Sequence, residues 1–423
     1  MTLEINFKTI DTETSKKIHH FILEQAKTGV KIWSTQEIYS LEDGTEFKFK
    51  NNLFQRKRKN GKEGVRYELV SNKEKLGEGG YGEVRKIKRT LALDKNGIHS
   101  KKEGKNGQRR AVKKQEHSKR NSLSALQNEY ELTERADQLH IKEPTLSDDS
   151  KNATSYTVMM LAPGKEIFDI INEDRLKTEV LTTKQRLDLS VALLRAVKER
   201  LTSREIIHRD LKPDNIFVKL DELPIKITIL DYGLAMDVNK LAEKTRGSPC
   251  YLAPELLEDP LNASYKADVF SIARIITLVW GASNDTYDST LFEDSSDAFA
   301  LTTTQRLENL FSGINDIGFG LQTLIVSTLQ EMLETDPEYR SSIDEAIDLF
   351  SSFEIEEQKQ PDSLINPTVL AENKVIPLEK RASSTRFSFF KSHRDSSDDS
   401  YESSDKIAQN LISHESSNEL QFC

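Results

Sequence analysis

The spacing of apolar residues changes along the chain from short alternating runs to helical repeats. Between about 71 and 162, short alternating stretches surround one helical stretch, Ser122 to Leu139, which predicts a small β-rich lobe. From about 163 to 353 the spacing is mostly that of helices. A chain of 423 residues exceeds what one hydrophobic core usually supports, so we expect two packed lobes with appendages.

The first 70 residues contain two patterns of their own. Ser15 to Gln25 has helical spacing, carried by Ile18, Phe21 and Ile22. From Glu46 to Val70, phenylalanines alternate with lysines and Asn60-Gly61 forms a strong turn signal, which predicts a β-hairpin. We expect this extension, residues 1–70, to pack on the small lobe; a disordered leader is the alternative.

Three further segments are polar. Residues 90–110 contain two Asn-Gly turns and are predicted to form a solvent loop, and residues 282–300 interrupt the helical lobe in the same way. After Phe353 the chain becomes acidic and Ser-rich, so residues 354–423 cannot bury enough apolar surface to fold alone. We predict a mostly disordered tail there.

Composition narrows the class of protein. The net charge of −9 gives no overall basic field, so nucleic-acid binding is not expected, and the basic run Arg56 to Lys59 is interpreted as solvated hairpin surface. Cys250 and Cys423 are the only cysteines, which suits a reducing compartment. The N-terminus lacks a secretory pattern, and the most apolar run, Ile272 to Trp280, contains Arg274 and is predicted to be a buried helix. A cytoplasmic protein without a membrane span is the expectation.

One loop carries the chemistry of phosphoryl transfer. In His208-Arg209-Asp210-Leu211-Lys212-Pro213-Asp214-Asn215, Asp210 can accept a hydroxyl proton, Lys212 can offset charge on a moving phosphoryl group, and Asn215 can offer a neutral oxygen to Mg²⁺. The loop resembles the catalytic loop of eukaryotic-type protein kinases. The resemblance implies an α+β bilobal kinase fold with a small β-rich N-lobe over 71–162 and a helical C-lobe over 163–353, and ATP with Mg²⁺ as cofactors.

Upstream motifs resemble the nucleotide site of that family. Gly77, Gly79, Gly82 and Val84 fit its glycine-rich loop; a plain turn or a dinucleotide site would also explain them, but the strand pattern continuing after Val84 favours a phosphate-covering hairpin. Ala111 and Lys113 fit its third strand, where the lysine grips phosphates. The partner of Lys113 is expected to be Glu129, with Glu131 the alternative, and Thr133 stands where the family has an apolar residue.

The segment between the lobes resembles the kinase hinge. By that resemblance, Met159 guards the adenine pocket, the backbones of Met160 and Ala162 bind adenine, and Glu166 reaches the ribose. A buried strand followed by a turn is the alternative interpretation.

Downstream motifs complete the resemblance. Asp231, after the strand Ile225 to Leu230, is expected to bind Mg²⁺ together with Asn215, although Tyr232 replaces the usual phenylalanine. Gly247 to Glu255 resembles the end of the activation segment, in which Ser248 would hydrogen-bond near Asp210 and Lys212, as in Ser/Thr kinases. The resemblance further implies that Asp268 is a buried anchor for the catalytic loop and that Thr245 is an activating phosphorylation site paired with Arg209. It also implies an ion pair between Glu255 and Arg340.

The sequence therefore predicts a Ser/Thr protein kinase acting on protein hydroxyls, with autophosphorylation at Thr245 or in the tail. A pseudokinase scaffold, a small-molecule kinase and a nucleotidyl transferase on the same fold are the alternatives. Residues Arg381 to Ser388 are an expected phosphoacceptor stretch. The acidic, Ser-rich end with Phe422 also resembles the translocation tails of bacterial effector kinases, which would place the protein in the host-cell cytosol; a generic disordered tail is the alternative.

Overall fold

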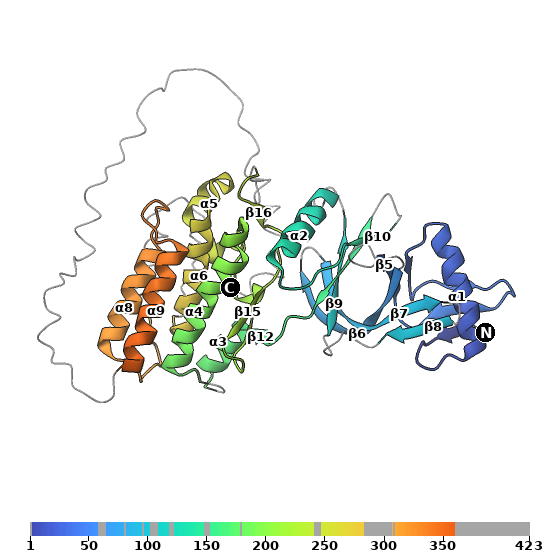
Figure 1. Ribbon diagram of the computed structural model, residues 1–423, viewed down its shortest axis with the longest axis horizontal. Helices are drawn as coiled ribbons and strands as arrows, with labels where there is room; N and C mark the ends of the chain where they lie inside the picture. Colours follow the sequence, from blue (N-terminus) through green and yellow to red (C-terminus); the bar gives the residue numbers. More distant parts are fainter. Residues whose placement is uncertain are drawn as a thin grey trace, which may run out of the picture. The chain divides into compact units, whose positions relative to one another are not determined.

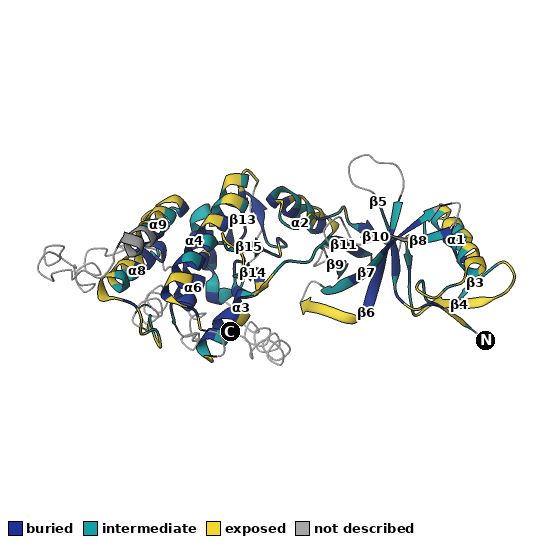
Figure 2. Ribbon diagram, turned by 60° about the horizontal axis from the view of Figure 1, so that its bottom comes forward, coloured by how far each residue is buried: buried dark blue, intermediate teal, exposed yellow. Residues whose placement is uncertain are grey.

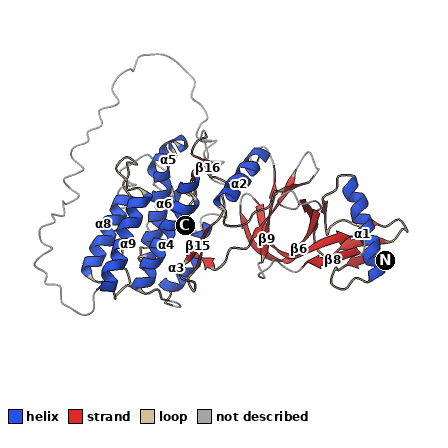
Figure 3. Cartoon of the chain, viewed as in Figure 1, coloured by secondary structure: helices blue, strands red, loops and turns tan. Residues whose placement is uncertain are grey.

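The computed structural model describes residues 2–57, 65–79, 82–94, 97–101, 109–117, 122–147, 153–177, 180–240, 247–282, 307 and 309–359. Residues 1–354 form one compact unit. Strands dominate the first part of that unit and helices the second (Figure 3). The structure therefore has the mixed α and β composition expected of a small sheet lobe followed by a helical lobe.

The first part is built on one long sheet with a helix beside it (Figure 1). Its strand order is β10-β11-β9-β7-β6-β5-β2, and β8 pairs with the far end of β7. A second, smaller sheet has the order β1-β4-β3. The elements are β1 (Leu3–Ile5), α1 (Thr12–Lys27), β2 (Ile32–Trp33), β3 (Tyr39–Ser40), β4 (Glu46–Phe49), β5 (Leu53–Lys57), β6 (Val65–Gly79), β7 (Gly82–Asp94), β8 (Gly97–Lys101), β9 (Arg110–Glu116), α2 (Leu123–Ala136), β10 (Thr145–Leu146) and β11 (Thr154–Met160).

The N-terminal extension has a hydrophobic core of its own. Asp11 caps α1 by accepting a hydrogen bond from the Thr14 N–H at 2.8 Å, and the helix buries Ile18 and Ile22 completely. These side chains pack with Phe47, Trp33 and other apolar residues of β1, β4, β6 and β7. Each such side chain contributes about 1.5–3 kcal/mol by leaving water. The extension is therefore packed structure rather than a disordered leader.

The insert at 90–110 is not the simple solvent loop that its composition predicts. The prediction is wrong for two stretches, because β7 continues to Asp94 and pairs with β8 in an antiparallel hairpin. A Cβ on Gly97 would lie 3.4 Å from the Ser15 hydroxyl, so the hairpin lies against α1, and Ile98 packs on the extension's core. The polar sequence conceals this contact because only one face of the hairpin is covered.

Part of the basic run is also more buried than its sequence suggests. Arg56 donates to Glu68 at 2.6 Å, and Arg110 donates to the same carboxylate at 2.9 Å. Glu68 is fully buried and accepts a further hydrogen bond from the Thr90 hydroxyl at 2.7 Å. Arg56 is therefore a structural partner and not solvated surface. The Asn60-Gly61 turn, residues 283–300 and the tail beyond Lys359 lie outside the described residues.

The second part is a helical bundle with small β-elements at one end. Its core is the largest in the protein and surrounds α6, whose middle is buried on all sides (Figure 2). Arg274 is inside this helix and buried, as expected for a core helix. None of the described helices is long and apolar enough to cross a membrane. The elements are β12 (Lys165–Glu166), α3 (Ile167–Arg175), α4 (Thr183–Arg200), η1 (Thr202–Arg204), β13 (Ile206–Ile207), η2 (Pro213–Asn215), β14 (Ile216–Lys219), β15 (Lys226–Ile229), β16 (Met236–Asp237), η3 (Pro249–Tyr251), α5 (Pro254–Glu258), η4 (Pro260–Asn262), α6 (Tyr265–Val279), α8 (Phe319–Met332) and α9 (Ile343–Lys359).

Candidate active site

One face of the long sheet gathers four of the predicted nucleotide-site residues. Val84 of β7 lies directly opposite Lys113 of β9, and Ala111 lies opposite Met159 of β11. Directly paired residues of neighbouring strands share a face, and so do residues two apart on one strand. Val84, Ala111, Lys113 and Met159 therefore line the same surface.

The glycine-rich end of this face is a hairpin between β6 and β7. Gly79 pairs with Gly82, and the two residues between them lie outside the described part. Gly82 has φ +141°, and a Cβ there would come within 2.1 Å of the Lys114 carbonyl oxygen, so packing requires this glycine. A Cβ on Gly77 would meet nothing within 4 Å. The Gly77 end of β6 is exposed, which leaves room above the sheet face (Figure 2).

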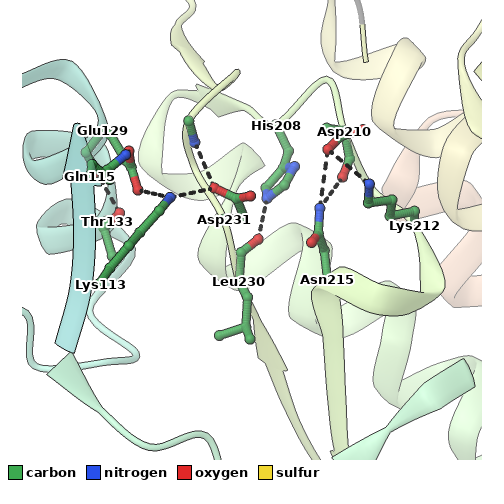
Figure 4. A network of polar contacts seen from close by, with 11 residues as sticks. Lys113, Gln115, Glu129, Thr133, His208, Asp210, Lys212, Asn215, Leu230 and Asp231 are labelled. Carbon is green, nitrogen blue, oxygen red and sulfur yellow. Dashed lines mark hydrogen bonds and ion pairs between the residues drawn. The ribbon is translucent and has the colours of Figure 1, made fainter. Parts of the chain in front are cut away.

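Lys113 joins the two lobes through two carboxylates (Figure 4). Its Nζ lies 2.7 Å from Glu129 Oε1 on α2 and 3.1 Å from Asp231 Oδ1 after β15. Burial acts to lower the pKa of the Lys113 ammonium, but the negative charges of Glu129 and Asp231 outweigh it and hold that pKa above its usual range. Lys113 therefore stays protonated while most of its surface is covered.

The geometry distinguishes between the two glutamates that the sequence left open. Glu129 faces Lys113, whereas Glu131 accepts a hydrogen bond from Gln127 at 2.8 Å on the same helix. Gln115 Nε2 donates to the second carboxylate oxygen of Glu129 at 3.2 Å, and the Thr133 hydroxyl donates to the Glu129 carbonyl at 2.6 Å. Sequence reasoning missed Gln115; its place two residues after Lys113, on the same strand face, was the available signal.

A buried carboxylate holds the loop that follows β13. Asp268 of α6 accepts the backbone N–H groups of His208 at 2.8 Å and Arg209 at 3.0 Å. Burial raises the pKa of Asp268, and these donors together with the nearby positive charge oppose that rise. His208 is completely buried, and its Nε2 bonds the Leu230 carbonyl at 3.0 Å. These contacts fix the backbone of Arg209, which has φ 63°, just before Asp210.

Asp210 is held by groups from two segments. Asn215 Nδ2 donates to its carbonyl at 2.9 Å and to Oδ2 at 3.2 Å, and Lys212 Nζ lies 3.9 Å from Oδ2. The backbone N–H of Ser248 donates to Oδ1 at 2.7 Å, so it is the main chain of Ser248 that contacts Asp210. A Cβ on Gly247 would lie 2.1 Å from the Arg209 carbonyl oxygen. Gly247 therefore allows its segment to pack closely on the loop that carries Asp210.

Asp231 and Asn215 are neighbours through the main chain. The Leu230 N–H, one residue before Asp231, donates to the Asn215 carbonyl at 2.8 Å. Asp231 has φ 58°, and the positive charge of Lys113 is the main cause that holds its pKa below the usual range, against the effect of burial. The side chain of Tyr232 is buried beside the His208 ring, with 5.1 Å between ring centroids, and its hydroxyl has no partner among the described residues.

The site offers few protein ligands for a cation. No group of three or more His, Cys, Asp or Glu residues that could hold a metal occurs in the described part of the chain. Mg²⁺ usually takes one or two carboxylates and completes its shell with waters and substrate phosphates. Because Asn215 Nδ2 faces Asp210, its Oδ1 is turned away from that carboxylate and can act as a neutral ligand near Asp231.

The hinge segment presents backbone groups. Leu161 N–H bonds the Arg109 carbonyl at 3.0 Å, so its neighbour Met160 directs its own backbone groups away from β9. The Met160 N–H donates to the Leu139 carbonyl at 2.7 Å, which leaves the Met160 carbonyl for a ligand. Glu166 ends β12 and is the N-cap residue of α3, and burial together with the charges of Asp169 and Asp214 raises its pKa.

A second charge pair lies away from these residues. Arg340 Nη1 and Nη2 donate to the two oxygens of Glu255 at 2.7 and 2.8 Å, and the Arg340 side chain is fully buried. This pair forms as its place in the sequence pattern predicts. Thr245, in contrast, lies outside the described residues.

Comparison with known proteins agrees with this arrangement. A family model described as a protein kinase domain matches residues 70–349. Similar proteins include a serine/threonine-protein kinase of Drosophila yakuba, 31% identical over 49% of this chain and 26% of its own length, and a probable serine/threonine-protein kinase of Zea mays, 30% identical over 47% and 29%. A probable serine/threonine-protein kinase of Plasmodium falciparum is 36% identical over 29% of this chain and 23% of its own. The matches thus span about a quarter of the length of these relatives.

Proposed function

Because this chain belongs to the protein kinase domain family, we propose that it transfers the γ-phosphoryl group of ATP to serine or threonine hydroxyls of proteins. The observation that carries the proposal is the bridge of Lys113 between Glu129 at 2.7 Å and Asp231 at 3.1 Å. This bridge joins the proposed nucleotide face of the sheet to the carboxylate of the other lobe that would bind Mg²⁺, as phosphoryl transfer requires. Pseudokinase scaffolds have no need to keep all three groups.

Each residue of the site would have a role in binding ATP or Mg²⁺ that follows from its position. Lys113 would hold the α and β phosphates, and Gly77, Gly79 and Gly82 would let backbone approach the phosphates. Asn215 and Asp231 would hold Mg²⁺, which supplies positive charge to the phosphate oxygens. The Met160 carbonyl and Ala162 would bind adenine between Val84, Ala111 and Met159, and Glu166 would bind the ribose.

Asp210 would orient the acceptor hydroxyl and take its proton. Its carboxylate is already held by Asn215 and by the Ser248 N–H, so little reorganisation is needed when a substrate binds. Lys212, near the same carboxylate, would offset charge on the moving phosphoryl group. The identities of Lys212 and Ser248, which resemble those of Ser/Thr kinases, support serine and threonine as acceptors.

The test is phosphate transfer by the full chain and by Asp210→Asn. Loss of the positioned base should slow incorporation of labelled phosphate about 10²–10⁴-fold. Asp214→Asn is the matched control, because Asp214 is exposed in the same loop and should leave the rate unchanged. Equal rates for the parent and Asp210→Asn would refute the assignment. Mass spectrometry of the product separates phosphate from nucleotide transfer.

Finer parts of the proposal rest on sequence. Autophosphorylation at Thr245 or in residues 381–388 predicts modified peptides that are absent from Asp210→Asn. Delivery into a host cell, and a cytosolic location there, rest on the acidic, Ser-rich composition of the tail. Unchanged delivery after deletion of residues 380–423 would refute the translocation hypothesis.

A further inference from the structure

A row of polar side chains lies next to Lys113 on the same face of the long sheet. On β11, Thr157 lies directly opposite Lys113, and Ser155 lies directly opposite Gln115 of β9. Directly paired residues share a face, and so do residues two apart on one strand. His117 follows Gln115 by two positions and continues the row. We call Gln115, His117, Ser155 and Thr157 the polar strip.

Helix α2 covers the polar strip. Glu129 of this helix accepts a hydrogen bond from Gln115 Nε2 at 3.2 Å, and Figure 4 shows the two side chains together beside Lys113. The His117 N–H donates to the Ala153 carbonyl at 2.8 Å, so the two strands stay paired up to this residue. The four side chains of the strip are 0–6% exposed. The strip is therefore interior surface, enclosed between the sheet and a helix.

Each member of the polar strip has a side-chain atom without a hydrogen-bond partner among the described residues. These atoms are Gln115 Oε1, Ser155 Oγ, Thr157 Oγ1 and both ring nitrogens of His117. The orientation of the Gln115 amide follows from Glu129, because a carboxylate only accepts and so faces Nε2, which leaves Oε1 unpaired. Buried polar groups normally have partners, and an unpaired one destabilises the fold. Several such atoms on one face indicate a shared ligand.

Water is the ligand that fits the chemistry and the burial of the strip. Its hydroxyl, amide and imidazole groups donate and accept hydrogen bonds, and none of the four side chains is a carboxylate or an ammonium that would require a counter-ion. Exposed fractions of 0–6% close the strip to larger molecules. Ala153, Ser155 and Thr157 are all small, which leaves room between β11 and α2 that large apolar side chains would fill. A buried water typically makes about three hydrogen bonds to such groups.

We propose that bound waters occupy the polar strip and hold the Glu129 carboxylate in place through Gln115. Side chains directly opposite each other have Cβ atoms about 4.5–5.5 Å apart, so one water can join Gln115 Oε1 to Ser155 Oγ. Gln115 Nε2 then carries this anchorage to Glu129, the partner of Lys113. Thr157, opposite Lys113, holds the next water in the row.

The part of these residues in catalysis rests on the proposed function. If Lys113 holds the phosphates of ATP, Glu129 sets the direction of its ammonium. Gln115, Ser155 and Thr157 are then positioning residues, which do not touch ATP and act through that pair. They affect the binding of ATP and not that of the acceptor peptide, because the residues proposed to orient the acceptor lie in the other lobe.

The first experiment tests whether the strip contains water, and it needs no kinase activity. Thr157→Val keeps the shape of the side chain and removes the hydroxyl, whereas Thr157→Ser keeps the hydroxyl and removes a methyl group. With bound water, Thr157→Val should lower the urea midpoint of the full chain more than Thr157→Ser does. In a dry strip the order reverses, because valine removes an unpaired hydroxyl and serine only removes packing. Equal midpoints or the reversed order would overturn the proposal.

Thr154→Val is the matched control. Thr154 pairs with Glu116 on the opposite face of the two strands and is partly exposed. The same substitution there should leave the urea midpoint close to that of the parent. Equal shifts in Thr154→Val and Thr157→Val would show that the effect does not arise in the strip, which contradicts the proposal.

A crystal structure of the full chain locates the ligand directly. At a resolution that resolves waters, one water should lie within hydrogen-bond distance of both Gln115 Oε1 and Ser155 Oγ. Direct contact between these two side chains, or apolar groups filling the space between them, would contradict the proposal.

Steady-state kinetics test the positioning role. Gln115→Met keeps the length of the side chain and removes its hydrogen bonds. It should raise the KM for ATP at least about tenfold, the value of one hydrogen bond to a charged group, and leave the KM for the acceptor peptide unchanged. Thr157→Val should raise the KM for ATP less, and Thr157→Ser should return it to the parental value.

Two kinetic results separate this inference from the proposed function. An unchanged KM for ATP in Gln115→Met, or equal changes in both KM values, would refute the positioning role. A parent chain without phosphate transfer would refute the proposed function instead, and the urea midpoints and the located waters would still decide whether the strip binds water.

Discussion

The ion pairs Lys113–Glu129 and Glu255–Arg340 have similar bond lengths but differ in how fully their groups are satisfied. All five N–H donors of Arg340 are used: two reach Glu255 and three reach the backbone carbonyls of Glu334, Lys266 and Thr335. Lys113 instead holds Asp231, whose side chain is 41% exposed. A saturated pair can only support the fold, whereas a pair with an exposed third partner can exchange that partner for a ligand.

The largest expected effect comes from removing Lys113, whose pair with Glu129 has the exposed Asp231 as a third partner. Lys113→Met removes the donor proposed to hold the phosphates and should lower kcat/KM for peptide phosphorylation about 10²–10³-fold. The loss of folding stability should be smaller than that of Arg340→Met, because Glu129 keeps the hydrogen bond from Gln115. Steady-state kinetics and urea unfolding of the same preparations measure both quantities. A Lys113→Met protein that unfolds easily but retains full activity would contradict this prediction.

Breaking the saturated pair should act on folding. Arg340→Met leaves the Glu255 carboxylate buried without its cation, which should lower the free energy of unfolding by about 3–5 kcal/mol. Urea unfolding of the full chain measures this loss of free energy. The transition to monitor is that of the helical lobe, which contains both residues.

A double variant sharpens this result. Combining Arg340→Met with Glu255→Leu replaces both charges by apolar groups, so part of the lost stability should return. Additive losses in the double variant would show that the two side chains act independently, contrary to the bidentate geometry.

The smallest expected effect is a change in pH dependence. The pKa of Asp231 is held below its usual range mainly by the charge of Lys113, so this carboxylate adds stability above its unfolded pKa of about 3.9. That contribution is lost as the pH falls through the folded pKa. In Lys113→Met, burial dominates and the pKa of Asp231 should rise. Carboxyl NMR titration measures the shift, and an unchanged Asp231 titration would contradict the assigned cause.

Sequence reasoning worked best where chemistry and spacing agree. The strand before Asp231 and the pair Glu255–Arg340 were both predicted, because each depends on a short run of residues with distinctive side chains. The helix predicted at Ser15 to Gln25 exists as α1, although it extends to Thr12 and Lys27. Its ends depend on the Asp11 cap, which apolar spacing does not report.

The misses have a common physical cause. The contact of the β7–β8 hairpin with α1, the burial of Arg56 and the contact of Gln115 with Glu129 all join residues of different structural elements. Polar composition predicted solvent exposure in the first two cases, but tertiary contacts cover one face of each segment. Local patterns carry no information on such partners.

The buried carboxylate of Glu68 has a consequence for how this protein can be divided. Its partners come from three places: Arg56 in the extension, Thr90 on β7 and Arg110 on β9. The family match begins at residue 70, so a fragment cut there would lose Glu68, Arg56 and the first residues of β6 together. The segment that must stay together for folding is therefore longer than the segment that the family model matches. A chain with a different N-terminal extension would need another carboxylate to pair with Arg110.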